Sequence, residues 1–197
     1  MRGERVLEYV LPEATNFGRL RMLSWLETTA INVPSVQPDR IRRLAAMLAC
    51  DPAGHTDLSQ RLRLSNSQAV RLSMMTDGKF EPTPESDEID LRRKLLHLGG
   101  DDFRDLVLLS WASEMSIEPR RNPARTDAWF ALLARVDNWN KPRFPVNGSD
   151  AIALGLTEGP NIGLALQALE DWWCDGNFKA DKGQCMERLT KIIKEMR

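Results

Sequence analysis

The sequence is poor in the residues that build metal and disulfide sites. Of its 197 residues only three are cysteine and two are histidine. Cys50, Cys174 and Cys185 form no CxxC pair, and their odd number does not suit a disulfide scaffold, which favours a reducing cytoplasm. With only His55 and His97 present, a histidine-based metal site is not expected.

Long apolar runs and catalytic motifs are also missing. No stretch reaches the roughly 18 consecutive apolar residues of a membrane span, and Glu4 and Glu8 stand where a signal peptide has its apolar core. No GxSxG elbow, Walker loop or HExxH occurs, nor the Asp-x-Asp on an apolar strand that two-metal nucleotidyl transfer uses. We therefore expect a soluble, cytoplasmic chain with no catalytic residue and no metal ligand of its own.

Charge is nearly balanced overall, with a net charge of −1, but it is unevenly distributed. Residues 1–75 and 91–145 each carry a net +3, whereas 76–90 carry −5 and 146–197 carry −2. Two mildly basic blocks thus flank an acidic segment. From charge alone, ordinary surface variation is the simpler interpretation, because the imbalance is small.

Helical spacing of apolar residues recurs along the chain, and strand signals are few. The polar segment 76–88 contains two prolines and predicts a linker. The helix around 103–111 is apolar nearly all round, which predicts a buried position at the centre of the second domain. The expected organisation is all-α: a helical body domain over 1–75, an acidic linker over 76–90, and a helical tail domain over 91–197 with a helix–turn–helix at 148–174.

Arginines gather at two expected turns. The stretch RLRLSNSQAVRL predicts helix, tight turn and helix, with Ser65 or Asn66 as the N-cap of the second helix. A single arginine is more often a solvated surface charge than a ligand, but several that converge at a corner can hold phosphates. The candidates near this turn and in the tail are Arg61, Arg63, Arg71, Arg120, Arg121 and Arg143.

The most informative stretch is FPVNGSDAIALGLTEGPNIGLALQALEDWW, residues 144–173. It predicts a helix, a glycine turn and a second helix that Pro160 opens; Gly163 would allow a close helix approach. Amides at the start of such a helix suit a phosphate, so Gly159 and Asn161 are candidate RNA contacts. A tight helical hairpin without a ligand is an equally good interpretation. Trp172 and Trp173 could stack on bases, but their helical spacing favours core packing.

Three runs together resemble the C-terminal half of bacterial class II tRNA nucleotidyltransferases, the CCA-adding enzymes and their poly(A) polymerase relatives, in an alphaproteobacterial style. They are VLPEA, RLRLSN and the 144–173 stretch. The most specific match is a tail signature of the form G-x-D-x-x-x-L-G-x-x-x-G-P-x-x-G, which is met here by Gly148, Asp150, Leu154, Gly155, Gly159, Pro160 and Gly163.

The resemblance implies a body and tail whose catalytic head and neck precede VLPEA and are absent from this chain. Magnesium and CTP or ATP would bind in that missing part, so no cofactor is expected here and the chain alone is predicted to be inactive. The implied partners are tRNA and the N-terminal head and neck of the same enzyme, with a homodimer possible and no membrane contact. The implied role is to grip tRNA and fix the position of its 3′ end.

A helical protein–protein interaction or dimerisation scaffold is the alternative, favoured by the high tryptophan and methionine content and the lack of strong net charge. The sequence does not distinguish CCA addition, A addition and poly(A) synthesis.

Overall fold

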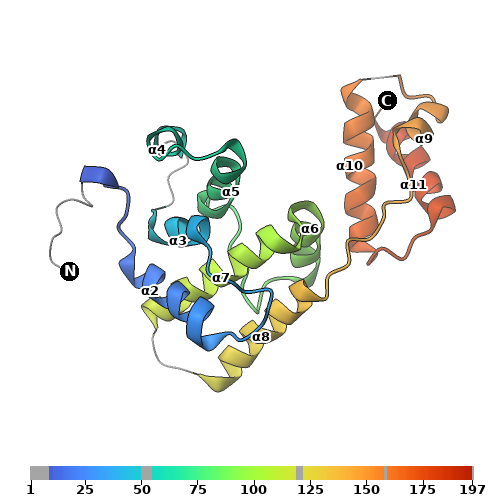
Figure 1. Cartoon of the computed structure of the whole chain (residues 1–197). Coiled ribbons are helices and arrows are strands. Elements are labelled where there is room, and N and C mark those ends of the chain that lie inside the picture. Colours follow the sequence, from blue (N-terminus) through green and yellow to red (C-terminus); the bar gives the residue numbers. More distant parts are fainter. Residues whose placement is uncertain (1–8, 50–54, 119–121, 158, 197) are drawn as a thin grey trace. The chain divides into compact units, whose positions relative to one another are not determined.

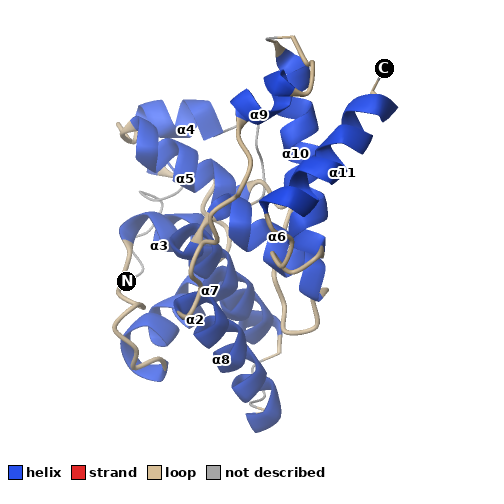
Figure 2. Ribbon diagram, turned by 90° about the vertical axis from the view of Figure 1, so that its right-hand side faces the viewer, coloured by secondary structure: helices blue, strands red, loops and turns tan. Residues whose placement is uncertain are grey.

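The computed structural model confirms an all-α fold (Figure 1). It describes residues 9–49, 55–118, 122–157 and 159–196. Over these ranges the chain forms helices and no strand, and one isolated antiparallel bridge joins Ala14 and Leu48 (Figure 2). None of the helices in these ranges is long and apolar enough to cross a lipid bilayer.

The described residues divide into two compact units. The first comprises the residues up to 86 together with 98–139, and the second comprises 87–97 and 140–196. The first unit contains α2 (Phe17–Trp25), the π-helix η1 (Leu26–Ala30), α3 (Arg40–Met47), α4 (His55–Arg61), α5 (Asn66–Thr76), α7 (Gly100–Ile117) and α8 (Pro123–Asp137). The second contains α6 (Glu88–Leu98, except its last residue), α9 (Gly148–Ala153), α10 (Pro160–Asp175) and α11 (Lys182–Glu195).

Helix α7 is the centre of the first unit. It packs against α2, α3, α5 and α8, and its inward side chains include Phe103, Val107 and Leu108, all almost fully buried. Burial of this helix was expected from its apolar circumference. The sequence predicted this helix at the centre of a tail domain over 91–197. In the structure its partners α2, α3 and α5 come from the N-terminal part of the chain.

Local capping chemistry explains where several helices begin. The Ser65 hydroxyl accepts from the Gln68 amide and the Gln68 side chain accepts in return from Ser65 N–H, a capping box that confirms the predicted start of α5. Helix α8 begins at Pro123, because the side chain of Asn122 caps it.

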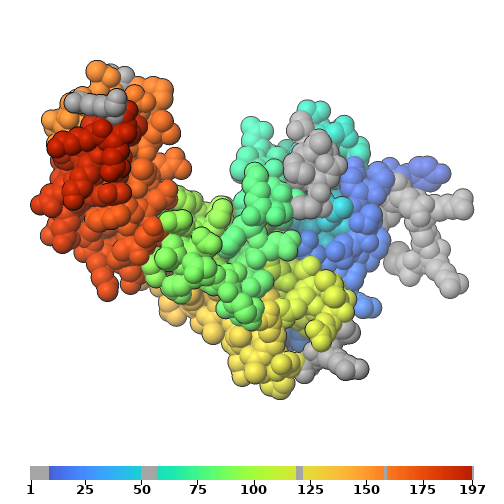
Figure 3. Space-filling view, turned by 180° about the vertical axis from the view of Figure 1, so that it is seen from behind, coloured from blue at the N-terminus to red at the C-terminus, as the bar shows by residue number. Residues whose placement is uncertain are grey.

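The second unit is held by an apolar cluster shared by α9, α10 and α11. The space-filling view shows these orange and red segments packed against one another (Figure 3). Leu169 and Leu189 are fully buried and face each other's helices, while Trp173 is 3% exposed. The other buried members are Val146, Ala151, Ala165, Cys185, Ile192 and Ile193.

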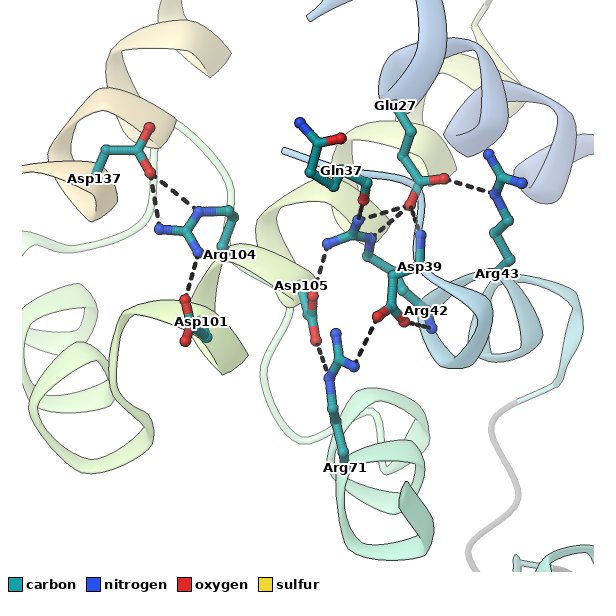
Figure 4. A network of polar contacts seen from close by, with 10 residues as sticks. All are labelled: Glu27, Gln37, Asp39, Arg42, Arg43, Arg71, Asp101, Arg104, Asp105 and Asp137. Atoms are coloured by element: carbon teal, nitrogen blue, oxygen red, sulfur yellow. Dashed lines mark hydrogen bonds and ion pairs between the residues drawn. The ribbon is translucent and has the colours of Figure 1, made fainter. Parts of the chain in front are cut away.

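A buried guanidinium organises the first unit. Arg42 of α3 is 4% exposed and donates to Glu27 of η1 through Nε at 2.8 Å and to Asp105 of α7 through Nη1 at 2.8 Å (Figure 4). It also donates to the carbonyl of Gln37. Glu27 and Asp105 are themselves 4% and 2% exposed. One planar side chain thereby joins three segments that are distant in the sequence.

The second oxygens of these carboxylates are also occupied. Arg43 donates from Nε to Glu27 Oε2 at 2.7 Å, and Arg71 donates from Nε to Asp105 Oδ2 at 2.7 Å. Arg71 further pairs with Asp39, the N-cap of α3, at 3.0 Å. Figure 4 shows the whole set as one chain of alternating charges. Because every buried charge has a partner, its cost of desolvation is offset.

A more exposed cluster ties α7 to α8. Arg104 donates from Nε and Nη2 to the same oxygen of Asp137, at 3.0 and 2.9 Å, and from Nη1 to Asp101 at 2.7 Å. Ser35 donates to the other oxygen of Asp137 at 2.8 Å. This hydrogen bond links the loop before α3 to the end of α8.

The carboxylate of Glu114, on α7, links the buried Trp129 to the guanidinium of Arg125. It accepts from Arg125 at 2.9 Å and from the indole N–H of Trp129 at 2.9 Å. Trp129 stacks on Trp111 with ring centroids 5.8 Å apart. The hydrogen bond from Arg125 holds the pKa of Glu114 below its ordinary value of 4.5 against the opposing effect of burial, and the Trp129 bond adds to this lowering.

We predict that Arg42→Met destabilises the first unit by about 3–5 kcal/mol, because it leaves Glu27 and Asp105 buried without their shared cation. Arg40→Met on the same helix is the matched control, and we expect it to cost less than about 1 kcal/mol since Arg40 is exposed. Urea unfolding followed by circular dichroism measures both. Equal losses for the two variants would contradict a central role for Arg42.

Glu114 makes stability depend on pH. Because its pKa is lowered in the folded state, its contribution is present above pH 4.5 and is lost as the pH falls through the folded pKa. We expect Glu114→Gln to reduce the loss of stability between about pH 5 and pH 3. Thermal unfolding across that window measures it, with Glu118→Gln, at the exposed end of α7, as the control for losing one carboxylate. An unchanged slope in Glu114→Gln would rule out this contribution.

Candidate nucleic-acid interface

The predicted helix–turn–helix of the tail is confirmed as α9, a glycine turn and α10. Asn147 and Asp150 form a capping box at the start of α9. At its end Gly155 has φ 91°, and its amide and that of Leu156 donate to Ile152 and Ala151 carbonyls, which closes the helix with a left-handed turn. The sequence folds this way because glycine alone takes that conformation without strain.

The corner between the two helices is open to solvent. Gly159 is the N-cap of α10 with φ 149° and ψ −172°, and Pro160 follows at the first helical position. Gly159, Asn161 and Gly163 are all exposed. The carboxylate of Asp150, in the first turn of α9, is paired with Lys182 at 2.9 Å, which lowers the pKa of Asp150. Among the described residues the start of α10 is therefore exposed, as a phosphate site at a helix N-terminus requires.

Gly163 does not have the role that was expected of it. A Cβ added at Gly163 would meet no atom within 4 Å, so this glycine permits no close helix approach. The predicted close helix approach at Gly163 was wrong, because Gly163 lies on the exposed side of α10. Gly148 does approach another segment: its Cβ would lie 3.7 Å from Ile162.

The corner between α4 and α5 carries Arg61 and Arg63. The guanidinium of Arg61 binds both oxygens of Glu13, at 2.8 and 2.9 Å, and Asp57 at 3.3 Å. The bonds from Arg61 lower the pKa of Glu13 and raise that of Arg61. Arg63 is exposed in the turn itself, with φ 51°. Unlike Arg61, Arg63 makes no ion pair with a carboxylate among the described residues.

Arg71 is directed elsewhere. It lies on α5, and its guanidinium is half-buried between Asp105 and Asp39. The hydrogen bond to Asp105 is the largest cause of a strongly raised pKa for Arg71. Sequence reasoning placed Arg71 with the turn arginines, whereas the structure gives it a place in the buried ion network. A role for it in RNA contact stays a prediction.

Of the three candidate arginines in the tail, one lies among the residues that the structure describes. Arg143 is exposed on the connector that precedes α9. Arg120 and Arg121 lie outside the described residues. Contacts of any of these residues with RNA stay predictions.

A basic groove in the second unit was missed by sequence reasoning. It has a volume of about 560 Å³ and lies between the end of α10, the turn after it and α11. Its cations are Lys179, Arg188 and Lys191. The signal was present, because Gln184, Arg188 and Lys191 follow one another at i, i+4 and i+7 on a single helix face. The contribution of Lys179 to the groove could not be predicted from the sequence, since it depends on how the turn after α10 folds.

The two adjacent tryptophans have different environments. Trp173 packs in the core against Phe144 and Phe178, at 5.3 and 4.9 Å between ring centroids, and donates to the Ala180 carbonyl at 3.0 Å. Core packing is thus confirmed for Trp173. Trp172 is half-buried and lines the basic groove.

The described residues do not form a metal site, because no three of their His, Cys, Asp or Glu side chains are grouped to hold an ion. Burial raises the pKa of the Cys174 and Cys185 thiols. These thiols are therefore poor nucleophiles at neutral pH.

Comparison with known proteins gives partial matches. No protein-family model matches the chain. Ninety residues, 46% of the chain, are 40% identical to an uncharacterized 28 kDa protein from the petA 5′ region of Rhodospirillum rubrum. Sixty residues, 30% of the chain, are 38% identical to the mitochondrial CCA tRNA nucleotidyltransferase 1 of Danio rerio and 32% identical to that of Homo sapiens. The matches span 35% of the Rhodospirillum protein and 14% of each enzyme. Part of this chain is therefore similar to CCA tRNA nucleotidyltransferases.

The glycine corner yields a paired prediction. Gly159→Ala should destabilise the second unit by about 1–3 kcal/mol, because its φ of 149° is strained for any residue with a Cβ. Gly163→Ala should stabilise α10 by about 0.5–1 kcal/mol, since the added methyl meets nothing. Thermal unfolding monitored by circular dichroism tests both. Similar changes in the two variants would contradict the conformation described for Gly159.

Proposed function

We propose that this chain is an RNA-binding and RNA-positioning part of an enzyme of the tRNA nucleotidyltransferase type. The observation that carries the proposal is the similarity of 60 of its residues to CCA tRNA nucleotidyltransferases. Its partners would be tRNA and the catalytic part of the same enzyme, which would hold magnesium and CTP or ATP. Whether that enzyme adds CCA or poly(A) is a property of the catalytic part.

The surface chemistry supports binding to a nucleic-acid backbone. Arg63 and Arg143 are exposed at turns or connectors, and the start of α10 is open. The groove beside α11 adds a cluster of cations. Contacts of this kind reach phosphates and do not read bases, which suits an enzyme whose substrates are tRNAs of different sequence.

Rigid helices suit the positioning of an RNA end. The ion network around Arg42 fixes η1, α3, α5 and α7 relative to one another within the first unit. A module that binds RNA at a fixed distance from a catalytic centre raises the effective concentration of the reacting end without any chemistry of its own.

One observation favours the alternative, a protein-interaction scaffold. The first unit exposes several large apolar side chains: Tyr9 and Ile117 are each 82% exposed, Val10 is 54% exposed and Phe17 is 50% exposed. Exposed apolar groups of this size are typical of surfaces that contact another protein. The two functions are distinguishable because only RNA binding depends steeply on salt.

Filter binding of a tRNA transcript at two salt concentrations tests the proposal. We expect affinity to fall roughly thirtyfold between about 50 and 200 mM salt, as for the neutralisation of about three phosphates. Weak binding that does not change with salt would favour the scaffold. Incorporation of CMP or AMP into tRNA by this chain alone would place catalysis on it and contradict a purely positioning role.

A further inference from the structure

The basic groove of the second unit is built by three segments. Trp172 comes from the last turns of α10, Lys179 from the turn that follows, and Gln184, Arg188 and Lys191 from one face of α11. Its volume of about 560 Å³ falls in the range of roughly 300–1,000 Å³ that is typical of small-ligand sites. The groove is therefore large enough for one nucleotide.

Its charge differs from that of the chain as a whole. Three cations line it, Lys179, Arg188 and Lys191, against the single carboxylate of Glu187, although the chain carries a net charge of −1. Concentrating like charges is unfavourable unless an anion neutralises them. The electrostatics of the groove therefore favour a phosphate.

Arg188 supplies a second indication of an anionic ligand. Its Nε is buried and has no hydrogen-bond partner among the described residues. A buried donor without an acceptor is unfavourable, and arginine donors match the oxygens of a phosphate in a fixed planar geometry. The guanidinium of Arg188 therefore has hydrogen-bonding capacity that the described residues do not use.

The turn that carries Lys179 adopts a rare conformation. Asn177 and Phe178 both have positive φ, 57° and 61°, without being glycine. The ring of Phe178 packs on Trp173, whose indole N–H donates to the Ala180 carbonyl, and these contacts hold the turn. Strained backbone that the surroundings maintain is typical of ligand sites. Here the turn carries Lys179 to the groove.

We propose that this groove binds one unpaired nucleotide of an RNA strand, with its phosphate at Arg188 and Lys191 and its base against Trp172. An aromatic side chain beside cations is the usual means of holding single-stranded nucleic acid, because every base has a face that can stack. The inference deepens the proposed function and rests on it for the choice of RNA as the ligand.

A matched pair of lysine substitutions on α11 tests the groove. Lys191 is exposed and lines it, whereas Lys182 is exposed, pairs with Asp150 and does not line it. We expect Lys191→Met to weaken binding of a fluorescent single-stranded RNA of about ten nucleotides three- to tenfold and to lower the salt slope by about one. Lys182→Met should change affinity less than twofold. Fluorescence anisotropy measures both affinities. Trp172→Leu should also weaken binding of the RNA, because it removes the aromatic face.

The outcomes separate this inference from the proposed function. Equal effects of Lys191→Met and Lys182→Met, or no binding of the short RNA by the wild-type chain, would overturn the groove as a nucleotide site. Failure of the wild-type chain to bind tRNA in a salt-dependent way would overturn the proposed function instead. Adding AMP or inorganic phosphate as competitors shows whether the groove prefers a free nucleotide, a bare phosphate or the RNA strand.

Discussion

The first unit depends on one buried cation. Arg42 is held by Glu27, Asp105 and the Gln37 carbonyl, and each of the two carboxylates has a second arginine on its other oxygen. Burial of such a set gives little net stability, since desolvation cancels much of the attraction. What it gives is geometry: the planar donors of Arg42 are satisfied only when η1, α3 and α7 lie in one arrangement. We infer that this network sets the rigidity of the unit, and hence the fixed spacing that a positioning module requires.

The second unit is held by other means. An apolar cluster around Leu169 and Leu189 packs its helices, and capping boxes at Asn147 and Asp181 fix the starts of α9 and α11. Ion pairs within this unit, such as Arg93 with Asp175 and Lys182 with Asp150, leave other surface cations available for a ligand. Arg188 and its neighbours in the groove are of this kind.

Much of the helical order was predictable from the sequence, because caps and apolar spacing are local signals. An N-cap at Ser65 or Asn66, the glycine turn at Gly155 and the start of α10 at Pro160 were expected, and the structure confirms them with Ser65 as the cap. The burial of Arg42 was not expected, since an arginine on a helix is usually solvated and its carboxylate partners lie 15 and 63 residues away. The membership of α7 in the first unit likewise follows from long-range packing that periodicity does not encode.

The candidate site was predictable only in part, for the same reason. The open corner at Gly159 and Asn161 followed from motif and cap chemistry. The inward direction of Arg71 depends on Asp105, a residue of a different helix. The groove depends on the turn that brings Lys179 towards α11, and a left-handed conformation at Asn177 and Phe178 cannot be inferred from their identities.

We propose that exposed helix starts and basic side chains of this chain contact RNA. Hydrogen–deuterium exchange of the chain with and without tRNA tests it most directly. We expect tRNA to slow exchange at the start of α10, around residues 159–163, and in the turn and helix that border the groove, residues 176–191. Unchanged exchange in these segments, with protection confined to the exposed apolar residues Tyr9, Phe17 and Ile117, would contradict it.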